Sequence, residues 1–93
     1  MILQWLPKAL ANRDAQIAYI AQDNPLAAIT QGDLIKTKVD QLIEQPGLGR
    51  IGRKRGTREL VISKTPFVVI FRVKAKRIEI IRLLHSSQQY PAS

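Results

Sequence analysis

Basic side chains are concentrated in residues 48–93, and such side chains can bind a phosphate group or help to cleave a phosphodiester bond. Cleavage of a phosphodiester bond without a metal ion needs cations that stabilise the charged transition state. It also needs a group that moves the proton of the ribose 2′-hydroxyl. The candidates for such a set, or for binding an anionic target, are Arg53, Lys54, Arg55, Arg58, Arg72, Arg82, His85 and Tyr90.

Each candidate also has an ordinary structural explanation, and both interpretations remain open. His85 stands at the end of an expected strand, where a histidine is often a satisfied structural residue. Tyr90 suits packing in a tail, or stacking on a base. Arg58, Arg72 and Arg82 also fit solvated sheet positions whose aliphatic stems are buried.

Other catalytic chemistries find little support in the composition. The chain has one histidine and no cysteine, which excludes a Cys–His nucleophile pair and argues against a zinc site. Glu59 and Glu79 are expected to balance arginines across a sheet rather than to form an acid–base pair. The stretch 47–56, GLGRIGRKRG, lacks the residue order of a phosphate-binding P-loop. We expect no metal and no cofactor.

Charge is distributed unevenly along the 93 residues, which carry a formal net charge of +8. Residues 1–47 hold four basic and five acidic side chains, a balance of −1. Residues 48–93 hold eleven basic and two acidic side chains, a balance of +9. Such a surface favours nucleic acid, ribosomal RNA or an acidic protein segment as partner. A solvated basic surface without a specific ligand is the alternative.

The sequence also carries expectations about the compartment and about membranes. The longest apolar run is too short to span a bilayer, and no basic segment precedes an apolar one at the N-terminus. The absence of cysteine agrees with a reducing environment. We therefore expect a cytoplasmic protein without a membrane partner.

A three-stranded meander is predicted for residues 57–85. Three runs rich in Val, Ile and Phe, at 60–62, 67–73 and 78–84, are separated by short polar connectors. The run 67–73 is almost wholly apolar, which places it between the other two. Strands this short need a covering layer, so the remaining chain must supply helices.

The N-terminal part, residues 1–46, is predicted to form an edge strand and a helical hairpin. Pro7 suits the first turn of a helix that continues to about residue 22. Asn24 is the expected N-cap of a second helix, with Pro25 at its first position. In that helix Gly32 interrupts an apolar stripe, and close approach of the first helix would explain it. A basic, glycine-rich loop at 47–56 and a tail at 86–93 complete a single domain, 1–93.

Several segments resemble the RelE/ParE superfamily of bacterial type II toxin–antitoxin toxins. They are residues 19–28 (YIAQDNPLAA), 46–49 (PGLG), 67–73 (FVVIFRV) and 78–91 (IEIIRLLHSSQQYP). The resemblance covers nearly the whole chain. It implies an α+β fold of order β-α-α-β-β-β, with the helical hairpin packed on a small, mainly antiparallel sheet. It also implies a toxin that arrests growth, stabilises plasmids and is neutralised by a cognate acidic antitoxin.

Within the superfamily the chain is closer to the ParE-like branch. RelE-like members are ribosome-dependent mRNA endonucleases with a catalytic arginine early in the central strand, where this chain has Val68. ParE-like members carry an aliphatic residue there, and they are described as poisons of DNA gyrase. The resemblance therefore favours gyrase inhibition by a chain that is not an enzyme.

Two alternatives remain open. The first is a RelE-like nuclease acting on mRNA in the ribosome, with Arg58, Arg82, His85 and Tyr90 as its catalytic set. The second is a basic RNA- or protein-binding module without toxicity. For a toxin, the resemblance implies contact with operator DNA only through the antitoxin. It also implies assembly as a homodimer or as a toxin–antitoxin heterotetramer.

Overall fold

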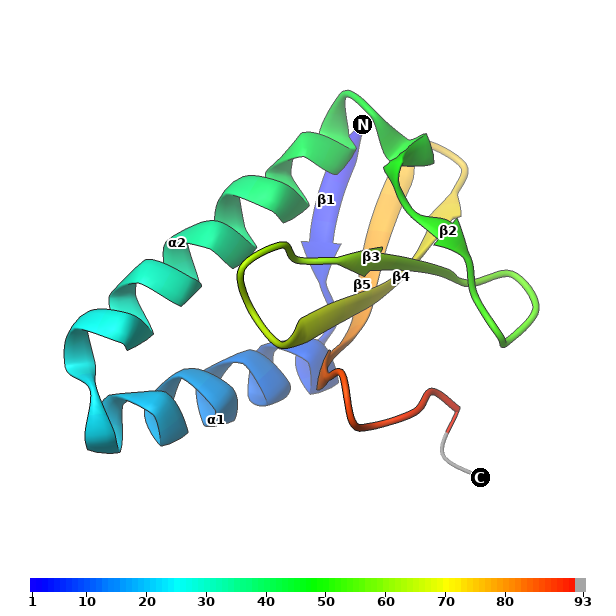
Figure 1. The fold of residues 1–93 in the computed structure, drawn as a ribbon. Helices are drawn as coiled ribbons and strands as arrows, with labels where there is room; N and C mark the ends of the chain where they lie inside the picture. The colour runs from blue at the N-terminus through cyan, green and yellow to red at the C-terminus, as the bar shows by residue number, and fades with distance from the viewer. Residues whose placement is uncertain (92–93) are drawn as a thin grey trace.

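A helical hairpin covers one face of a five-stranded sheet in residues 1–91, which the computed structural model describes (Figure 1). The strands lie in the order β1-β5-β4-β3-β2, and all neighbours except β1 and β5 run antiparallel. The predicted α+β fold is confirmed. In chain order the elements are β1 (Ile2–Trp5), α1 (Pro7–Asp23), α2 (Pro25–Asp40), the 3-10 turns η1 (Gln41–Ile43) and η2 (Pro46–Leu48), β2 (Arg50–Ile51), β3 (Arg58–Val61), β4 (Phe67–Lys74) and β5 (Arg77–His85).

The central strand β4 provides the floor of the core, as its composition predicts. Phe67, Val69 and Phe71 point toward the helices, and each is at most 2% exposed. Alternation along a strand places the intervening side chains on the opposite face. Pairing with β5 is continuous except for an irregularity between Ile70 and Phe71. The meander β3-β4-β5 thus has one face in the core and one face free of helices.

The helical hairpin begins its second arm as predicted. The side chain of Asn24 accepts a hydrogen bond from the backbone N–H of Ala27 at 3.0 Å, and Pro25 occupies the first turn of α2. Such a cap satisfies one of the free N–H groups at a helix start. Ile35 and Val39 of α2 are buried against the sheet. Within residues 1–91 no helix is long and apolar enough to cross a membrane.

Gly32 faces α1, but the contact is looser than the sequence suggests. A Cβ atom added at Gly32 would meet only the Cδ1 atom of Ile17, at an ordinary 3.7 Å. Close approach of the two helices therefore does not require glycine here.

Replacing Gly32 by Ala should therefore stabilise the protein. Alanine removes the entropic cost of glycine in a helix interior, which is about 1 kcal/mol, and the methyl group fits. Urea unfolding should show a higher midpoint with an unchanged slope. A lower midpoint for Gly32→Ala would contradict this prediction and mean that the added methyl group clashes with α1.

The two edges of the sheet differ in how well they were predicted. β1 is the predicted edge strand, and it runs parallel to β5 with Leu6 donating to the carbonyl of Ile80 at 2.9 Å. β2 differs from the prediction, since the sequence predicts a loop throughout residues 47–56. Arg50 and Ile51 instead pair with Glu59 and Arg58 of β3 and turn the basic stretch into a hairpin.

Candidate functional site: the outer face of the sheet

The sheet face without helices carries an apolar strip beneath a polar tail. Val68 and Ile70 of β4 lie on this outer face, and in register they oppose Leu84 and Arg82 of β5. The tail from Ser86 to Tyr90 runs beside the strip and helps to line a hollow of about 160 Å³ above it. Val68, which stands where RelE-like members have an arginine, therefore lines a pocket rather than an open surface.

Backbone contacts hold the hairpin between β2 and β3 in one shape. The N–H of Gly52 donates to the carbonyl of Thr57 at 2.8 Å, and the N–H and hydroxyl of Thr57 both donate to the carbonyl of Lys54. A Cβ added at Gly52 would lie 2.4 Å from the Thr57 hydroxyl oxygen, so the turn leaves no room for a side chain. This cationic hairpin, residues 50–58, projects from the sheet away from α2 (Figure 1). Residues 53–55 at its tip are exposed.

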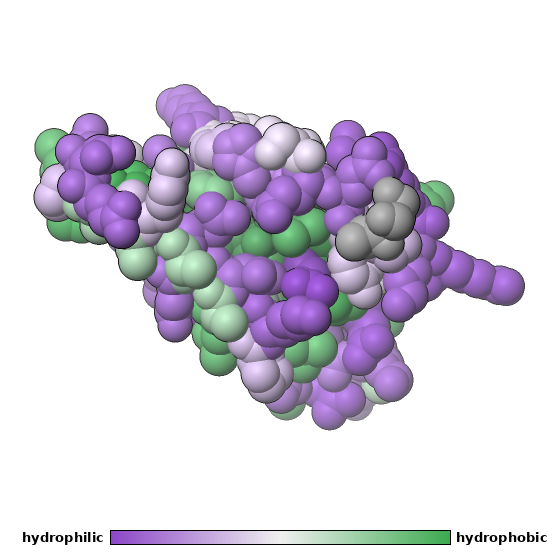
Figure 2. Space-filling model, turned by 90° about the horizontal axis from the view of Figure 1, so that it is seen from below, coloured by the Kyte–Doolittle hydropathy of each residue, from purple (hydrophilic) through white to green (hydrophobic). Residues whose placement is uncertain are grey.

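Tyr90 joins the tail to this hairpin and to β5. The ammonium of Lys54 lies 5.6 Å from the centre of the Tyr90 ring, and the guanidinium of Arg82 lies 5.9 Å from it. Both distances suit cation–π attraction. These residues line a hollow of about 660 Å³ with Leu84 and residues 87–91. Seen from below, the end of the molecule that carries the hairpin is largely hydrophilic (Figure 2).

His85 is not part of this group. It opposes Phe67 in register, which places it on the helix-covered side of the sheet, and its ring meets the Phe67 ring edge-on at 6.2 Å. Its Nδ1 atom lies 2.9 Å from the hydroxyl of Ser87 and 3.2 Å from the N–H of Ser87. His85 thus shapes the turn into the tail, which agrees with its structural interpretation.

Arg58 also lies away from the cations of the outer face. It opposes Phe71 in register and therefore points to the helix-covered side. Its guanidinium donates to the carbonyl of Gly49 at 2.9 Å, while its buried Nε atom has no partner. The proposed nuclease set is therefore divided, because Arg82 and Tyr90 lie together while Arg58 and His85 do not join them.

Arg72 lies on the outer face but is bound to a carboxylate. Its Nε atom donates to Glu79 at 2.6 Å, and Arg77 approaches the second oxygen of Glu79 at 3.4 Å. The hydrogen bond from Arg72, helped by the charges of Arg72, Arg77 and Lys74, holds the pKa of Glu79 below its ordinary value of 4.5. The expectation that Glu79 balances arginines across the sheet is confirmed.

The lowered pKa of Glu79 predicts a specific acid sensitivity. A carboxyl whose pKa is lower in the folded state contributes stability that is complete above about pH 4.5 and is lost as the pH falls through the folded pKa. Glu79→Gln should therefore flatten the fall of the unfolding temperature below pH 4.5. Thermal unfolding at several pH values measures this effect, with the exposed Glu44→Gln as control. Parallel acid limbs for Glu79→Gln and the native chain would contradict the prediction.

The expectation that Glu59 balances an arginine across the sheet is confirmed, but sequence reasoning missed Arg50 as its partner and as a residue of the pocket. Arg50 donates to Glu59 at 3.1 Å, and both side chains line the hollow above Val68 together with Arg53 and Tyr90. The signal was present, since Arg50 and Glu59 occupy facing positions once the hairpin is recognised. No group of three or more metal-ligating side chains occurs within residues 1–91.

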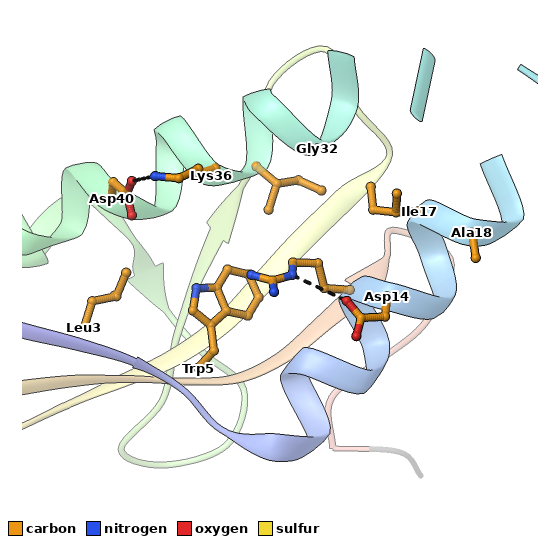
Figure 3. Close-up of a pocket in the computed structure, with 10 residues that line it drawn as sticks. Leu3, Trp5, Asp14, Ile17, Ala18, Gly32, Lys36 and Asp40 are labelled. Atoms are coloured by element: carbon orange, nitrogen blue, oxygen red, sulfur yellow. Dashed lines mark hydrogen bonds and ion pairs between the residues drawn. The ribbon is translucent and has the colours of Figure 1, made fainter. Parts of the chain in front are cut away.

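A third hollow lies between the two helices and β1, at the other edge of the sheet from the cationic hairpin (Figure 3). It has a volume of about 600 Å³, and its lining includes Leu3, Trp5 and Ile17. The guanidinium of Arg13 lies over the Trp5 ring at 4.7 Å, and Lys36 and Asp40 form an ion pair on its α2 side. This hollow, the β1 groove, is mainly apolar and borders the free edge of β1.

Comparison with known proteins decides the family. The family model "ParE toxin of type II toxin-antitoxin system, parDE" matches residues 3–90, which is nearly the whole chain. The chain belongs to the ParE toxin family. Its fold is also that of a solved structure, "Chromosomal ParDE TA system from P. aeruginosa", with a TM-score of 0.83 and 33% identity over 91% of this chain and 95% of that one.

Two curated relatives are also described as toxins, and one of them carries the RelE name. "Putative toxin Y4kP" of Sinorhizobium fredii is 39% identical over 96% of this chain and 92% of its own length. "Toxin RelE2" of Caulobacter vibrioides is 36% identical over 90% of this chain and 93% of its own. This ParE-family chain is therefore a type II toxin of the RelE/ParE superfamily, which has a cognate antitoxin as partner.

Proposed function

We propose that this ParE-family toxin arrests growth by inhibiting DNA gyrase, and that the outer face with its tail and cationic hairpin is the surface that engages the target. The observation that carries the proposal is the floor of the outer-face pocket. Val68, Ile70 and Leu84 line it, so the position where RelE-like nucleases place an arginine is aliphatic. A valine neither donates a hydrogen bond nor neutralises charge.

The arrangement of the other candidates supports the same choice. Losing one preorganised donor from a catalytic site typically costs about 10²–10³ in rate. Arg58 is engaged with the Gly49 carbonyl and His85 with Ser87, so neither stands beside the pocket to replace it. A surface of cations around Tyr90 suits binding to an anionic complex better than it suits proton transfer.

A RelE-like nuclease is the second candidate, and one observation favours it. Glu59 lines the pocket with Arg50, Arg53 and Tyr90, so a carboxylate and cations do share one hollow. A carboxylate there would accept the proton of a ribose 2′-hydroxyl, and the arginines would stabilise the charged phosphate. Cleavage of mRNA on programmed ribosomes that is abolished by Glu59→Gln would favour this candidate over gyrase inhibition.

Inducible expression in a bacterial host tests the proposal in cells. We expect viable counts to fall on induction, plasmid DNA to become more relaxed, and a co-expressed cognate antitoxin to restore growth. Arg82→Ala should weaken both effects because it removes a cation beside Tyr90. Normal growth with folded, soluble toxin would contradict toxicity, and arrest with normal plasmid supercoiling would contradict the gyrase mechanism.

We propose further that the antitoxin inserts an apolar segment into the β1 groove. Within residues 1–91, β1 is an edge strand that no further strand pairs with, and it lies beside an apolar hollow, which suits an added strand or helix. Trp5 is the only tryptophan of the chain, so its fluorescence reports occupancy directly. We expect antitoxin binding to shift this emission. Full neutralisation without a change in Trp5 fluorescence would place the antitoxin elsewhere.

A further inference from the structure

The tip of the cationic hairpin carries three consecutive basic side chains without acidic partners. Residues 53–55 are exposed, and none of them takes part in an ion pair within residues 1–91. The carboxylates of the basic half are already engaged, Glu59 by Arg50 and Glu79 by Arg72. The charge of the tip is therefore available to a partner.

The backbone that carries these cations is held in one shape before any partner arrives. Thr57 closes the turn with two hydrogen bonds to the Lys54 carbonyl, at 3.0 Å from its N–H and 2.6 Å from its hydroxyl. Arg58 anchors the base of the hairpin on Gly49. A surface that is already ordered loses little conformational entropy on binding, which favours affinity.

Two like charges also converge on one aromatic ring beside the tip. Lys54 and Arg82 approach Tyr90 at 5.6 and 5.9 Å, and the residues of the described chain, 1–91, that line this hollow include no carboxylate. Repulsion between two such cations is relieved when an anion binds near both. The hollow therefore favours a negatively charged ligand.

The chemistry of the tip fits a phosphodiester backbone better than a protein surface. Residues 52–58 (GRKRGTR) contain no large apolar side chain, whereas the core of a protein interface is usually apolar and depleted in charge. A two-stranded ribbon also has the size that the major groove of duplex DNA admits. These features favour duplex DNA over an acidic protein segment.

We propose that the cationic hairpin, together with Arg82, binds the phosphate backbone of duplex DNA directly. This inference rests on the proposed function, gyrase inhibition, because gyrase acts on duplex DNA and the toxin would meet both together. The DNA contact itself belongs to this chain alone and does not require the antitoxin. Tyr90 acts as a positioning residue that keeps Lys54 and Arg82 on the same side of the tail.

Fluorescence anisotropy of a labelled DNA duplex, titrated with the purified toxin without gyrase or antitoxin, tests the proposal. Each phosphate contact adds about 0.9 to the slope of log affinity against log salt. Four contacts predict that affinity falls about 150-fold between 50 and 200 mM salt, whereas one contact predicts about 3.5-fold. We expect the first value for the native chain and the second for the triple variant Arg53→Gln, Lys54→Gln, Arg55→Gln.

A charge-matched control separates the hairpin from net charge. Lys64 and Lys76 are exposed in the turns that flank β4, and Lys74 is exposed at the end of β4. None of the three forms an ion pair within residues 1–91. Changing these three to Gln should leave the slope of the native chain intact. Arg82→Gln, which leaves the hairpin unchanged, should lower the slope by about one. Thermal unfolding of each variant verifies that it is folded.

Three results would overturn the proposal: no duplex binding by the native chain, equal loss of slope in both triple variants, or tighter binding of single-stranded RNA than of the duplex. Gyrase supercoiling measured on the same preparations keeps the two proposals distinct. Inhibition of supercoiling without duplex binding would leave the proposed function standing and remove the DNA contact. Duplex binding without inhibition of supercoiling would support the DNA contact and contradict the proposed function.

Discussion

Phe71→Ala should lower the free energy of unfolding by about 3–5 kcal/mol. The Phe71 side chain is fully buried in the central strand, between the helices and the rest of the sheet. Truncation removes its transfer free energy from water and leaves a cavity that a rigid sheet cannot close. Urea unfolding followed by circular dichroism measures the change.

Val73→Ala is the matched control, since Val73 lies two residues further along the same face of β4 and is 41% exposed. Its loss should cost well under 1 kcal/mol, because little buried surface disappears. Similar costs for the two variants would contradict the assignment of Phe71 to the centre of the core.

Gly49→Ala should destabilise the protein by about 1–3 kcal/mol, because one methyl group has no space there. A Cβ at Gly49 would lie 2.6 and 2.7 Å from two atoms of the Phe71 ring and 3.0 Å from the Glu59 carbonyl oxygen. The backbone of Gly49 is extended, with φ −78°, so the cost is steric rather than conformational. The Arg58 contact at its carbonyl should loosen with it, and the cationic hairpin should become less ordered.

Gly47→Ala provides the control for this change, since a Cβ at Gly47 would meet nothing within 4 Å. It should alter the free energy of unfolding by less than about 0.5 kcal/mol. A Phe71→Leu background should reduce the cost of Gly49→Ala, because the two groups compete for one space. Additive costs for Gly49→Ala and Phe71→Leu would mean that Gly49 is required for another reason.

Local patterns in the sequence were sufficient for most of the fold. The almost wholly apolar run 67–73 predicts a strand with two neighbours, because both its faces carry apolar side chains. Asn24 and Pro25 predict the start of α2 because cap chemistry is a local property. These features depend on neighbours in sequence, so a single chain reveals them.

The site is formed by side chains that share one face of the sheet. The face on which each side chain lies is harder to predict from the sequence than the strands themselves. Arg58 shares a face with Leu60, two residues along β3, so alternation would have placed it on the core side. In β4 both faces are apolar, and the irregularity between Ile70 and Phe71 shifts the register with β5. The contact of Tyr90 with Lys54 joins residues distant in sequence, and no local pattern indicates it.

Supercoiling of relaxed plasmid by purified DNA gyrase, with programmed ribosomes and mRNA in a parallel reaction, tests the proposed function most directly. We expect this chain to inhibit supercoiling, Arg82→Ala to inhibit it less, and the mRNA to remain intact. The pocket floor of Val68, Ile70 and Leu84 is the reason for the last expectation. Unaffected supercoiling together with codon-dependent cleavage of mRNA would contradict gyrase inhibition and establish the nuclease instead.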